Sequence, residues 1–492
     1  MSIIILSAVL SIHYCGFFLS KPSVFSGMSA DRSARRALSR SKNTYLSRQW
    51  PVSVRDEQNN SFELILHPIL DDVSLSVPRF FLSNEEDGSM ETLGKTCLTK
   101  ALTQMIGRTT IDGSSDFSVR TIYIGIPSLN DNWHCRHTLE NIFRRAKYPE
   151  RIRVGVVDQF NFDKTQSCDV PLQSCSKEPS QALCQYRPQI DVYEMESDLA
   201  IGPTFARHLV DRLYRGEYYV LRIDSHTSFT KHWDVDIIEQ LEGTGNEMAI
   251  LTTFLDETKD NLNEKTGFSE KESRKVLCNA VYEGSGYDRF LRYPSIEQPD
   301  ELPAITEMPQ LQPYFASQFS FARGHFVLTV PHDPNVPLIS TEDEEISIAI
   351  RAFTHGYDFY TPQRHVCFDN SSEHKKGEIP IEKKVKSNIN AKIMKSSLER
   401  LYGILGMTGS ELVIEDNMFG IGFVRTVKQF HNAYGIHPGE RVTEKNLCNY
   451  VSNGKMHKQF HNEQMKEDGM GINYDSIYFR FSELQNNHEN GR

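Results

Sequence analysis

The sequence contains no pair of cysteines spaced as Cys-x-x-Cys, and its nine cysteines are spread along 492 residues. A structural zinc site, which usually needs such closely spaced pairs, is therefore not expected. The chain also lacks excess positive charge: its net charge is −11, which argues against nucleic acid or an anionic membrane as the main partner. Three cysteines, Cys168, Cys175 and Cys184, lie close together in the sequence. They could form a disulfide in an oxidising compartment or remain thiols in the cytosol.

The first twenty residues lack charged side chains and contain two apolar runs, at 3–6 and 17–19. We interpret residues 1–20 as a possible membrane (signal) anchor, although no basic residue precedes them and the basic cluster at 32–42 follows them. The Ser- and Arg-rich segment 21–60 is typical of a flexible stem. Together these features favour a Golgi membrane protein, with the cytoplasm as the alternative compartment.

Apolar strand patterns alternate with helical patterns after residue 120, which predicts an α/β fold with a parallel sheet. The predicted strands lie at 121–127, 152–157, 190–195, 218–223, 248–252 and 315–322. The last of these has alternating character and is expected at an edge of the sheet. Helices are predicted at 137–146 and from Gly202 onward, where proline stands early in the helix.

The chain is expected to divide into further parts around a catalytic domain. The predicted parts are an N-terminal extension at 61–117, to which we assign no role, the catalytic domain at 118–375, its C-terminal part at 376–440 and a C-terminal tail at 441–492.

The predicted strand at 218–223 ends abruptly in Asp224, Ser225 and His226. In open α/β sheets, ligands lie at the carboxyl ends of the strands. A carboxylate and an imidazole two residues apart can bind one divalent cation, and the imidazole favours Mn²⁺ over Mg²⁺. A cation there could neutralise a departing diphosphate. The alternative is a polar turn in which Asp224 only caps the following segment.

Glu344 and Glu345 follow Thr341 and precede a helical pattern at 346–353. Acidic residues are common in a first helical turn because they interact favourably with the helix dipole, so a capping role is one interpretation. Arg207 lies near another helix start, where it could orient a phosphate or the carboxylate of Asp224, or form an ordinary structural salt bridge.

With these residues identified, the chain resembles the polypeptide N-acetylglucosaminyltransferases, which modify hydroxyproline or threonine of proteins. The resemblance spans about 120–437 and rests on separate blocks in the same order. The blocks are 126–131 (IPSLND), 148–159 (YPERIRVGVVDQ), 200–207 (AIGPTFAR), 221–226 (LRIDSH), 343–346 with 351–358 (DEEI and RAFTHGYD), and 419–426 (FGIGFVRT).

The resemblance implies a GT-A glycosyltransferase fold, in which a Rossmann-like half and an acceptor-binding half share one mixed sheet flanked by helices. It implies a UDP-sugar donor, a polypeptide acceptor, a divalent metal (Mn²⁺ or Mg²⁺) and retention of the anomeric configuration. The site residues that it implies are Asp224 and His226 as metal ligands, Ser128, Asp131, Arg207, Asp224 and Ser225 as nucleotide-sugar contacts, and Glu344 and Glu345 as catalytic carboxylates on the acceptor side.

One departure from the family pattern concerns the third metal ligand, which in the family is a histidine. The chain reads His-Val-Cys-Phe-Asp-Asn at 365–370, so Asp369 stands at the position of that histidine. Because a carboxylate can also bind Mn²⁺, we predict Asp369 as the third ligand. The alternatives are a shift to His365 and a loss of activity.

The leading hypothesis is transfer of N-acetylglucosamine from UDP-GlcNAc to a polypeptide hydroxyl. A second hypothesis changes the donor, for example to UDP-GalNAc. A third is a catalytically degenerate protein that acts as a sugar- or protein-binding scaffold. The loop at 126–131 lacks the Tyr-Arg of the family's Ala-Ser-Tyr-Arg-Asp turn, and this change and Asp369 favour the third hypothesis. The intact Asp224, His226, Glu344 and Glu345 favour the first.

Overall fold

The computed structural model describes residues 53–55, 61–65, 79–82, 121–215, 217–283, 290–293, 297–336, 338–372, 388–405 and 419–477. The predicted anchor at 1–20 lies outside these residues. Of the predicted stem and N-terminal extension, only three short antiparallel strands are described: β1 Ser53–Arg55, β2 Ser61–Ile65 and β3 Arg79–Leu82. Within the described residues, no helix combines the length and the apolar character needed to cross a membrane.

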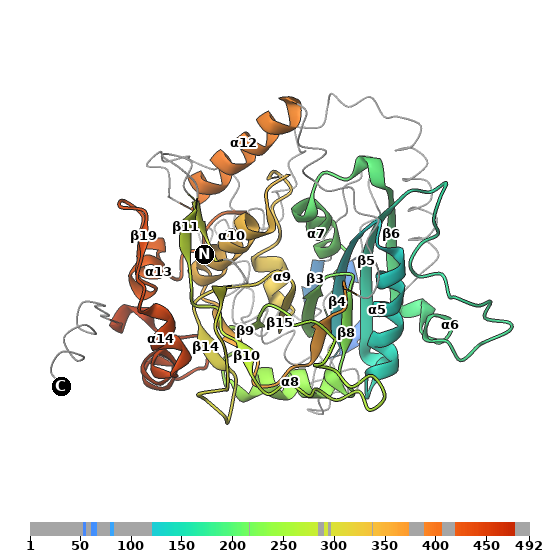
Figure 1. Ribbon diagram of the computed structural model, residues 1–492, viewed down its shortest axis with the longest axis horizontal. Coiled ribbons are helices and arrows are strands. Elements are labelled where there is room, and N and C mark those ends of the chain that lie inside the picture. The colour runs from blue at the N-terminus through green and yellow to red at the C-terminus, as the bar shows by residue number, and fades with distance from the viewer. Residues whose placement is uncertain are drawn as a thin grey trace, which may run out of the picture.

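The first half of the main sheet consists of parallel strands connected by helices (Figure 1). Its elements are β4 Ile122–Leu129, α5 Asn132–Arg145, β5 Ile152–Phe160, α6 Ala182–Gln185, β6 Ile190–Glu196, α7 Pro203–Asp211 and β7 Tyr219–Ile223. The strands are rich in Val, Ile and Tyr and are buried almost throughout, as expected for strands covered on both faces. They lie in the order β7-β4-β5-β6, which is a Rossmann-like arrangement.

The second half extends the same sheet beyond β7 with strands of both directions. It adds β9 Ala249–Thr252, β14 Gln310–Gln312, β15 Phe319–Arg323 and β16 Asp358–Thr361, and the complete order is β14-β16-β9-β15-β7-β4-β5-β6. One mixed sheet shared by two halves confirms the predicted α/β fold class and agrees with the GT-A fold that the resemblance implies.

The prediction that 315–322 forms an edge strand is wrong. The strand runs from Phe319 to Arg323 and lies inside the sheet, antiparallel to both β7 and β9. All five of its residues are buried. Large Phe319 and Phe321 alternate with small Ser320 and Ala322, and this alternation of size resembles the alternation of polarity that an edge strand shows.

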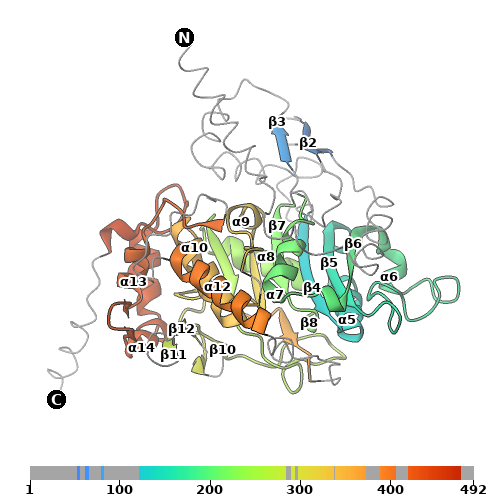
Figure 2. The same cartoon turned by 90° about the horizontal axis from the view of Figure 1, so that it is seen from above.

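Several elements outside the sheet surround the ends of its strands. They are β8 Thr227–Phe229, α8 Trp233–Gly243, α9 His325–Thr329, α10 Thr341–Thr354 and β17 Cys367–Asp369. Strand β17 pairs with β8, which directly follows the Asp224–His226 turn. Helix α10 packs against α7, so both helices lie on the same side of the sheet (Figure 2).

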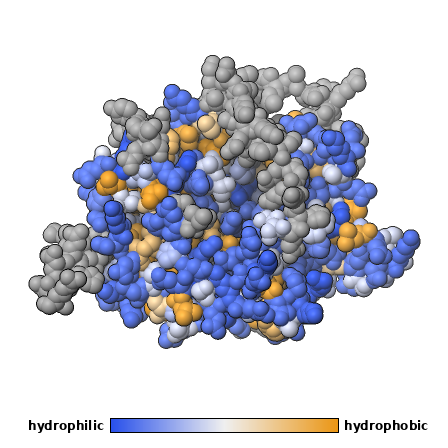
Figure 3. Space-filling model, in the orientation of Figure 1, coloured by the Kyte–Doolittle hydropathy of each residue, from blue (hydrophilic) through white to orange (hydrophobic). Residues whose placement is uncertain are grey.

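Further short strands and helices lie outside the main sheet, in addition to the short 3-10 helices η3 Pro149–Arg151, η4 Arg187–Gln189, η5 Ser197–Leu199 and η10 Tyr474–Ser476. They are β10 Arg274–Lys275, β11 Val281–Glu283, β12 Phe290–Arg292, β13 Asp300–Glu301, α12 Asn388–Ile404, α13 Val427–Ala433, β18 Ile436–His437, β19 Val442–Thr443, α14 Leu447–Ser452 and the π-helix η9 His457–Asn462. The face in Figure 3 is largely hydrophilic, with separate small apolar areas of the kind that protein surfaces commonly show.

Within the described residues, three disulfides connect parts of the fold: Cys135–Cys168, Cys175–Cys184 and Cys278–Cys448. All three clustered cysteines of the sequence are therefore paired, and Cys135 supplies the partner of Cys168. Among the described cysteines, Cys367 is a thiol and is buried.

Candidate active site

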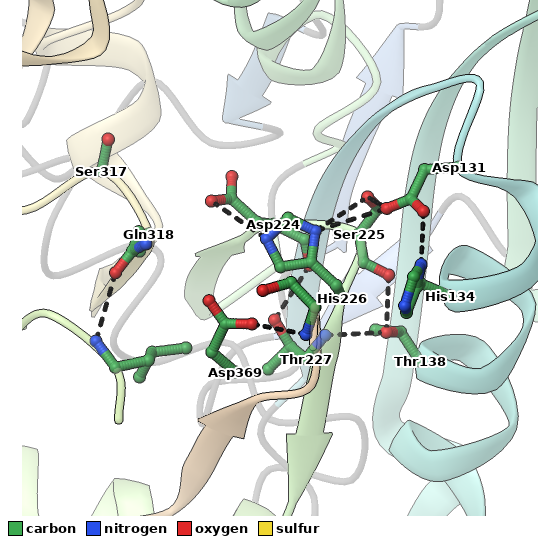
Figure 4. A network of polar contacts seen from close by, with 12 residues as sticks. Asp131, His134, Thr138, Asp224, Ser225, His226, Thr227, Ser317, Gln318 and Asp369 are labelled. Carbon is green, nitrogen blue, oxygen red and sulfur yellow. Dashed lines mark hydrogen bonds and ion pairs between the residues drawn. The ribbon is translucent and has the colours of Figure 1, made fainter. Parts of the chain in front are cut away.

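The Asp224–His226 turn lies where the sequence predicts it, at the carboxyl end of a central strand. Strand β7 ends at Ile223, and β8 begins at Thr227, so the three residues between them cross from the sheet to the β8–β17 pair (Figure 4). Helix α5 holds the turn from one side: the Thr138 hydroxyl donates to the Ser225 carbonyl at 2.7 Å and accepts from the Thr227 amide at 2.9 Å. These two hydrogen bonds fix the backbone of the turn.

Asp224 and His226 face each other across this turn. His226 Nε2 lies 4.0 Å from Asp224 Oδ2, and His226 Nδ1 lies 3.3 Å from Asp131 Oδ2 on the other side of the ring. The side chains of Asp224 and His226 are 20% and 14% exposed, so the space between them is reachable from solvent. The imidazole is therefore held between two carboxylates.

Asp131 lies against the turn rather than away from it. Its Oδ2 accepts a hydrogen bond from the Ser225 hydroxyl at 2.6 Å, and its Oδ1 contacts His134 Nδ1 at 2.5 Å. Burial by itself would raise the pKa of Asp131, but hydrogen bonds with His226, Ser225 and His134 lower it, and the net pKa lies below the ordinary value. Asp131 is therefore an anion that fixes Ser225 and one face of His226.

Arg207 bridges two carboxylates on opposite sides of the site. Its Nη2 donates to Asp224 Oδ1 at 3.0 Å, and its Nη1 donates to Glu344 Oε2 at 2.8 Å. Of the roles considered from sequence, the geometry favours orientation of the Asp224 carboxylate. Burial opposes the charge of Arg207, but Glu344 and Asp224 outweigh this effect and raise the pKa of the guanidinium.

Glu344 is buried and lies among cations. Besides Arg207, it accepts a hydrogen bond from the Thr204 hydroxyl at 3.0 Å, and its Oε1 lies 3.0 Å from His332 Nε2. Burial raises its pKa, but Arg207 and His332 lower it more, to about 2. The carboxylate is ionised and is 2% exposed, so it does not act as a helix cap facing solvent. Ser340 caps α10 instead, by accepting from the Asp343 amide.

Glu345 is equally buried, but within the described residues a serine rather than a cation holds its carboxyl group. Its Oε1 accepts from the amide and the hydroxyl of Ser317, at 2.8 and 2.9 Å. Burial raises the pKa of Glu345 to about 8, even though the Ser317 hydrogen bonds and the more distant Arg207 lower it. Glu345 is therefore mainly protonated at neutral pH.

Asp369 lies at the end of β17, beside the turn (Figure 4). It pairs with Thr227 in the two-stranded ladder, and the next amide, that of Asn370, donates to the His226 carbonyl at 2.9 Å. Its Oδ1 accepts from the Ser371 amide at 2.6 Å. His365 lies elsewhere, with Nε2 2.7 Å from the Ser273 carbonyl, so the shift of the third ligand to His365 finds no support in the geometry.

Ser128 is buried near the end of β4, opposite Asp158 of β5 in the parallel register. The Asp158 carboxylate accepts hydrogen bonds from the Cys168 amide at 2.8 Å and from the Asn132 side chain at 3.1 Å. Burial raises the pKa of Asp158 to about 7. The two residues end neighbouring strands at the same edge of the sheet as Asp224.

Three residues that were not predicted as site residues also lie at the site: His134, Asp158 and His332. Asp158 lies near the carboxyl end of β5, so a search for acidic residues close to strand ends would find it. His134 follows Asp131 by three residues at the start of α5. His332 follows β15 and α9 in a loop, and we find no sequence pattern that points to it.

A small cavity lies under the turn. It is lined by Gly125, Pro127, Arg207, Val210, Asp211, Arg222, Ile223, Phe315, Ser317 and His332. The lining combines residues of β4, α7 and β7 with residues before β15 and after α9. Arg207, which contacts Asp224, is one of the lining residues.

A carboxylate and an imidazole that share a solvent-reachable space are chemically suited to Mn²⁺. A histidine that ligates a metal usually has its second ring nitrogen held by a carboxylate, and Asp131 lies in that position beside His226. The residues therefore fit a divalent metal in type. Within the described residues, no three side chains of Asp, Glu, His or Cys are close enough together to form a complete metal site.

Comparison with solved structures finds glycosyltransferases at low similarity. GalNAc-T7 with UDP, GalNAc and Mn²⁺ matches at 10% identity and a TM-score of 0.36, over 82% of this chain and 74% of that chain. The mannosyltransferase PcManGT from Pyrobaculum calidifontis, with GDP-Man and Mn²⁺, matches at 12% identity and a TM-score of 0.31, over 63% and 81%.

TarS 1-349 from S. aureus, in complex with UDP-GlcNAc, matches at 11% identity and a TM-score of 0.29, over 73% of this chain and 99% of that chain. At such low TM-scores these similarities support no assignment of donor, acceptor or metal. No curated protein matches the chain.

The family comparison is stronger, because the profile described as "Glycosyltransferase (GlcNAc)" matches residues 121–183 and 163–440. The matched region includes the Asp224–His226 turn, Arg207, both glutamates and Asp369, and it covers most of the described sheet. This chain belongs to the GlcNAc glycosyltransferase family.

Proposed function

We propose that the protein is a metal-dependent, retaining glycosyltransferase that moves N-acetylglucosamine from UDP-GlcNAc to a hydroxyl of hydroxyproline, threonine or serine in a polypeptide. One observation carries the proposal: Asp224 and His226 face each other at 4.0 Å at the carboxyl edge of the central strand, with Arg207 fixing Asp224. Family membership supports glycosyl transfer. The donor sugar and the acceptor rest on the motif resemblance.

In this proposal Asp224 and His226 hold the divalent metal, which when bound would neutralise the diphosphate of the donor. Arg207 keeps Asp224 Oδ1 engaged, so that Oδ2 faces His226. Asp131 fixes the imidazole by its contact with Nδ1. These residues prepare the site before the donor arrives, and such preparation supplies much of the rate when the protein does little covalent chemistry.

We assign the two glutamates different roles. Glu344 is ionised and already engaged by Arg207, Thr204 and His332, so it acts as a positioning residue for Arg207. Glu345 carries a proton at neutral pH, so it is suited to donate a hydrogen bond rather than to accept the proton of the acceptor hydroxyl. Ser317 fixes the orientation of its carboxyl group.

Asp369 remains our candidate for the third ligand, because it adjoins the turn through β17 and β8. Asp369→Ala is expected to weaken the apparent Mn²⁺ affinity at least about tenfold, whereas Asp369→His should keep activity because imidazole suits the same ion. Both variants are measured by titrating Mn²⁺ in a UDP-sugar turnover assay. An unchanged Mn²⁺ dependence of Asp369→Ala would exclude the ligand role.

The function is tested by incubating the full chain with Mn²⁺ and either UDP-GlcNAc or UDP-GalNAc and measuring UDP release. Faster release from UDP-GlcNAc, abolished by EDTA and by Asp224→Asn, is expected. The matched control is Asp236→Asn, which changes a more exposed aspartate on α8. Preference for UDP-GalNAc would change the donor, and no Mn²⁺-dependent release from either sugar would favour the scaffold hypothesis.

We also propose that the described part of the chain folds in an oxidising compartment, and we favour the Golgi lumen. Three disulfides are typical of proteins that pass through the secretory pathway and unusual for cytosolic proteins. Residues 1–20 would then be the anchor. Retention of the full-length protein in the pellet after alkaline-carbonate extraction, together with resistance of its cysteines to thiol-blocking reagents in lysates, is the expected result. A protein that is released and fully thiol-reactive would instead be cytoplasmic.

A further inference from the structure

His332 occupies a buried position between two carboxylates. Its Nδ1 lies 2.7 Å from Asp211 Oδ2, at the end of α7, and its Nε2 lies 3.0 Å from Glu344 Oε1 on α10. The Asp211 carboxylate also accepts from the backbone amide of His332 at 2.9 Å. The imidazole is 1% exposed, so water does not replace either contact.

The two contacts fix the position of the ring. Each ring nitrogen faces a carboxylate oxygen within hydrogen-bond distance, so the imidazole connects α7 to α10. Asp211 and Glu344 each have a pKa of about 2, although burial would raise both, because an arginine and His332 lower them. Both carboxylates are therefore ionised and hold the imidazole between them.

His332 lies in the middle of a series of side chains joined by ion-pair contacts. Arg222 Nη2 lies 3.0 Å from Asp211, and Arg207 joins Glu344 to Asp224. In order, the series is Arg222, Asp211, His332, Glu344, Arg207 and Asp224. It begins within β7 and ends at the residue that follows β7.

Arg207 connects the series to Asp224. Its guanidinium is held by Glu344, which is fixed in turn by His332 and by the Thr204 hydroxyl. Removal of the imidazole would leave Glu344 with only Arg207 and Thr204 and would loosen the position of the Arg207–Glu344 pair.

We infer that His332 is a positioning residue that acts on the Asp224 carboxylate through Glu344 and Arg207. The inference deepens the proposed function and rests on it, since Asp224 is there a metal ligand. Groups that orient a metal ligand commonly contribute tenfold to a hundredfold in metal affinity. His332 acts from further away, so we expect a change near the lower limit.

The test compares His332→Gln with His208→Gln in the full chain. His208 serves as the control, because it is partly buried and its Nδ1 lies 2.9 Å from a backbone carbonyl, that of His332, rather than from a carboxylate. Burial lowers its pKa to about 4, so its replacement removes no charge at neutral pH. Mn²⁺ affinity is measured by the EPR signal of free Mn²⁺, and UDP release is measured separately.

His332→Gln is expected to weaken Mn²⁺ binding about tenfold, and His208→Gln to leave it within about twofold of the wild type. In a Glu344→Gln background, His332→Gln should cause little further loss, because its effect passes through Glu344. Thr204→Val, which nearly preserves side-chain shape and removes only the hydroxyl contact with Glu344, should weaken binding less and in the same direction. Thr204→Val keeps the inference testable if His332→Gln does not fold.

The outcomes separate this inference from the proposed function. If the wild type neither binds Mn²⁺ nor releases UDP, the proposed function fails. If the wild type does both and His332→Gln matches His208→Gln, or its effect adds fully to that of Glu344→Gln, the positioning role is overturned. Equal Mn²⁺ affinity in Thr204→Val and the wild type would overturn it when His332→Gln does not fold.

Discussion

Glu344 and Glu345 are adjacent on one helix and equally buried, but their surroundings differ. Their side chains are 2% and 1% exposed, and the pKa is about 2 for Glu344 and about 8 for Glu345. Arg207 and His332 contact Glu344, whereas the amide and the hydroxyl of Ser317 donate to Oε1 of Glu345. The partners, and not the degree of burial, therefore decide the charge of each carboxyl group.

The difference shows how two buried acids can serve one site. An ionised carboxylate inside a protein is tolerated when cations and donors surround it, and a carboxyl group without them keeps its proton. Glu344 holds Arg207 by an ion pair, and Arg207 in turn holds the Asp224 carboxylate of the turn. The Glu345 region, fixed to Ser317 before β15, supplies a neutral donor. Substitutions that change these partners should therefore alter the difference in charge between the two glutamates.

The largest effect is expected from Arg207→Met, which removes the cation that Glu344 and Asp224 share. Loss of one partner of a buried ion pair typically destabilises a protein by about 3–5 kcal/mol, because the remaining charge is uncompensated. Urea unfolding at pH 7 measures this change. Arg364→Met is the control: Arg364 is 49% exposed in its pair with Asp236, and an exposed pair contributes about 0–1 kcal/mol. Equal losses of unfolding free energy in Arg207→Met and Arg364→Met would contradict the role of Arg207 as a buried ion-pair partner.

A smaller difference is expected between two matched amides. Glu344→Gln removes the anion that pairs with buried Arg207 and should cost about 3 kcal/mol. Glu345→Gln should cost less than about 1 kcal/mol, because the residue is already neutral and an amide oxygen can still accept from Ser317. The free energy of unfolding of both variants, measured side by side at pH 7, tests the order. A larger cost for Glu345→Gln would reverse our assignment of charge.

The pH dependence of stability provides a further distinction. The folded-state pKa of Glu345, about 8, lies above its ordinary value of 4.5, so its contribution to stability is complete below pH 4.5 and is lost as the pH rises through 8. The wild type should therefore lose stability relative to Glu345→Gln between pH 5 and 9. For Glu344 the pKa is lowered, so its contribution is lost as the pH falls from 4.5 toward 2. Parallel profiles for wild type and Glu345→Gln would show that Glu345 is ionised.

The smallest effect is expected from Ser340→Ala, which removes the cap of the helix that carries both glutamates. Loss of a serine cap typically costs about 1 kcal/mol. Because the change leaves the partners of both carboxyl groups in place, the pH profile should keep its shape and shift as a whole. A changed slope between pH 5 and 9 would mean that the helix end, and not the partners, controls the protonation of Glu345.

The sequence was sufficient to predict the elements that position the turn. The run at 218–223 is apolar and β-branched and stops at three polar residues, and the structure places the end of a central strand there. The parallel first half followed from regular alternation of strand and helix patterns. The strand at 319–323 was assigned to an edge because a single sequence does not distinguish alternating size from alternating polarity.

Contacts between distant segments were not predictable in the same way. Arg207 and Glu344 are separated by 137 positions, and His332 and Asp211 by 121. The first pair is brought together by the packing of α7 against α10, and the second by the loop between α9 and α10, and local patterns encode neither contact. Glu345 keeps its proton because it is buried and its hydrogen-bond partner is Ser317 rather than a cation. These surroundings form only when the chain folds. The motif resemblance named both glutamates but did not distinguish them.

The family match ends at residue 440, but the fold continues, and this has a practical consequence for expression. The Gln310 side chain on β14 donates to the Val451 carbonyl at 2.6 Å, and the Leu311 amide donates to His457 at 3.0 Å. The later segment thus covers the outermost strand of the sheet, and Cys448 joins it to Cys278. A gene truncated at the family boundary would encode a protein with an uncovered strand edge and an unpaired thiol, and such edges promote self-association. Expression clones should therefore extend at least through residue 477.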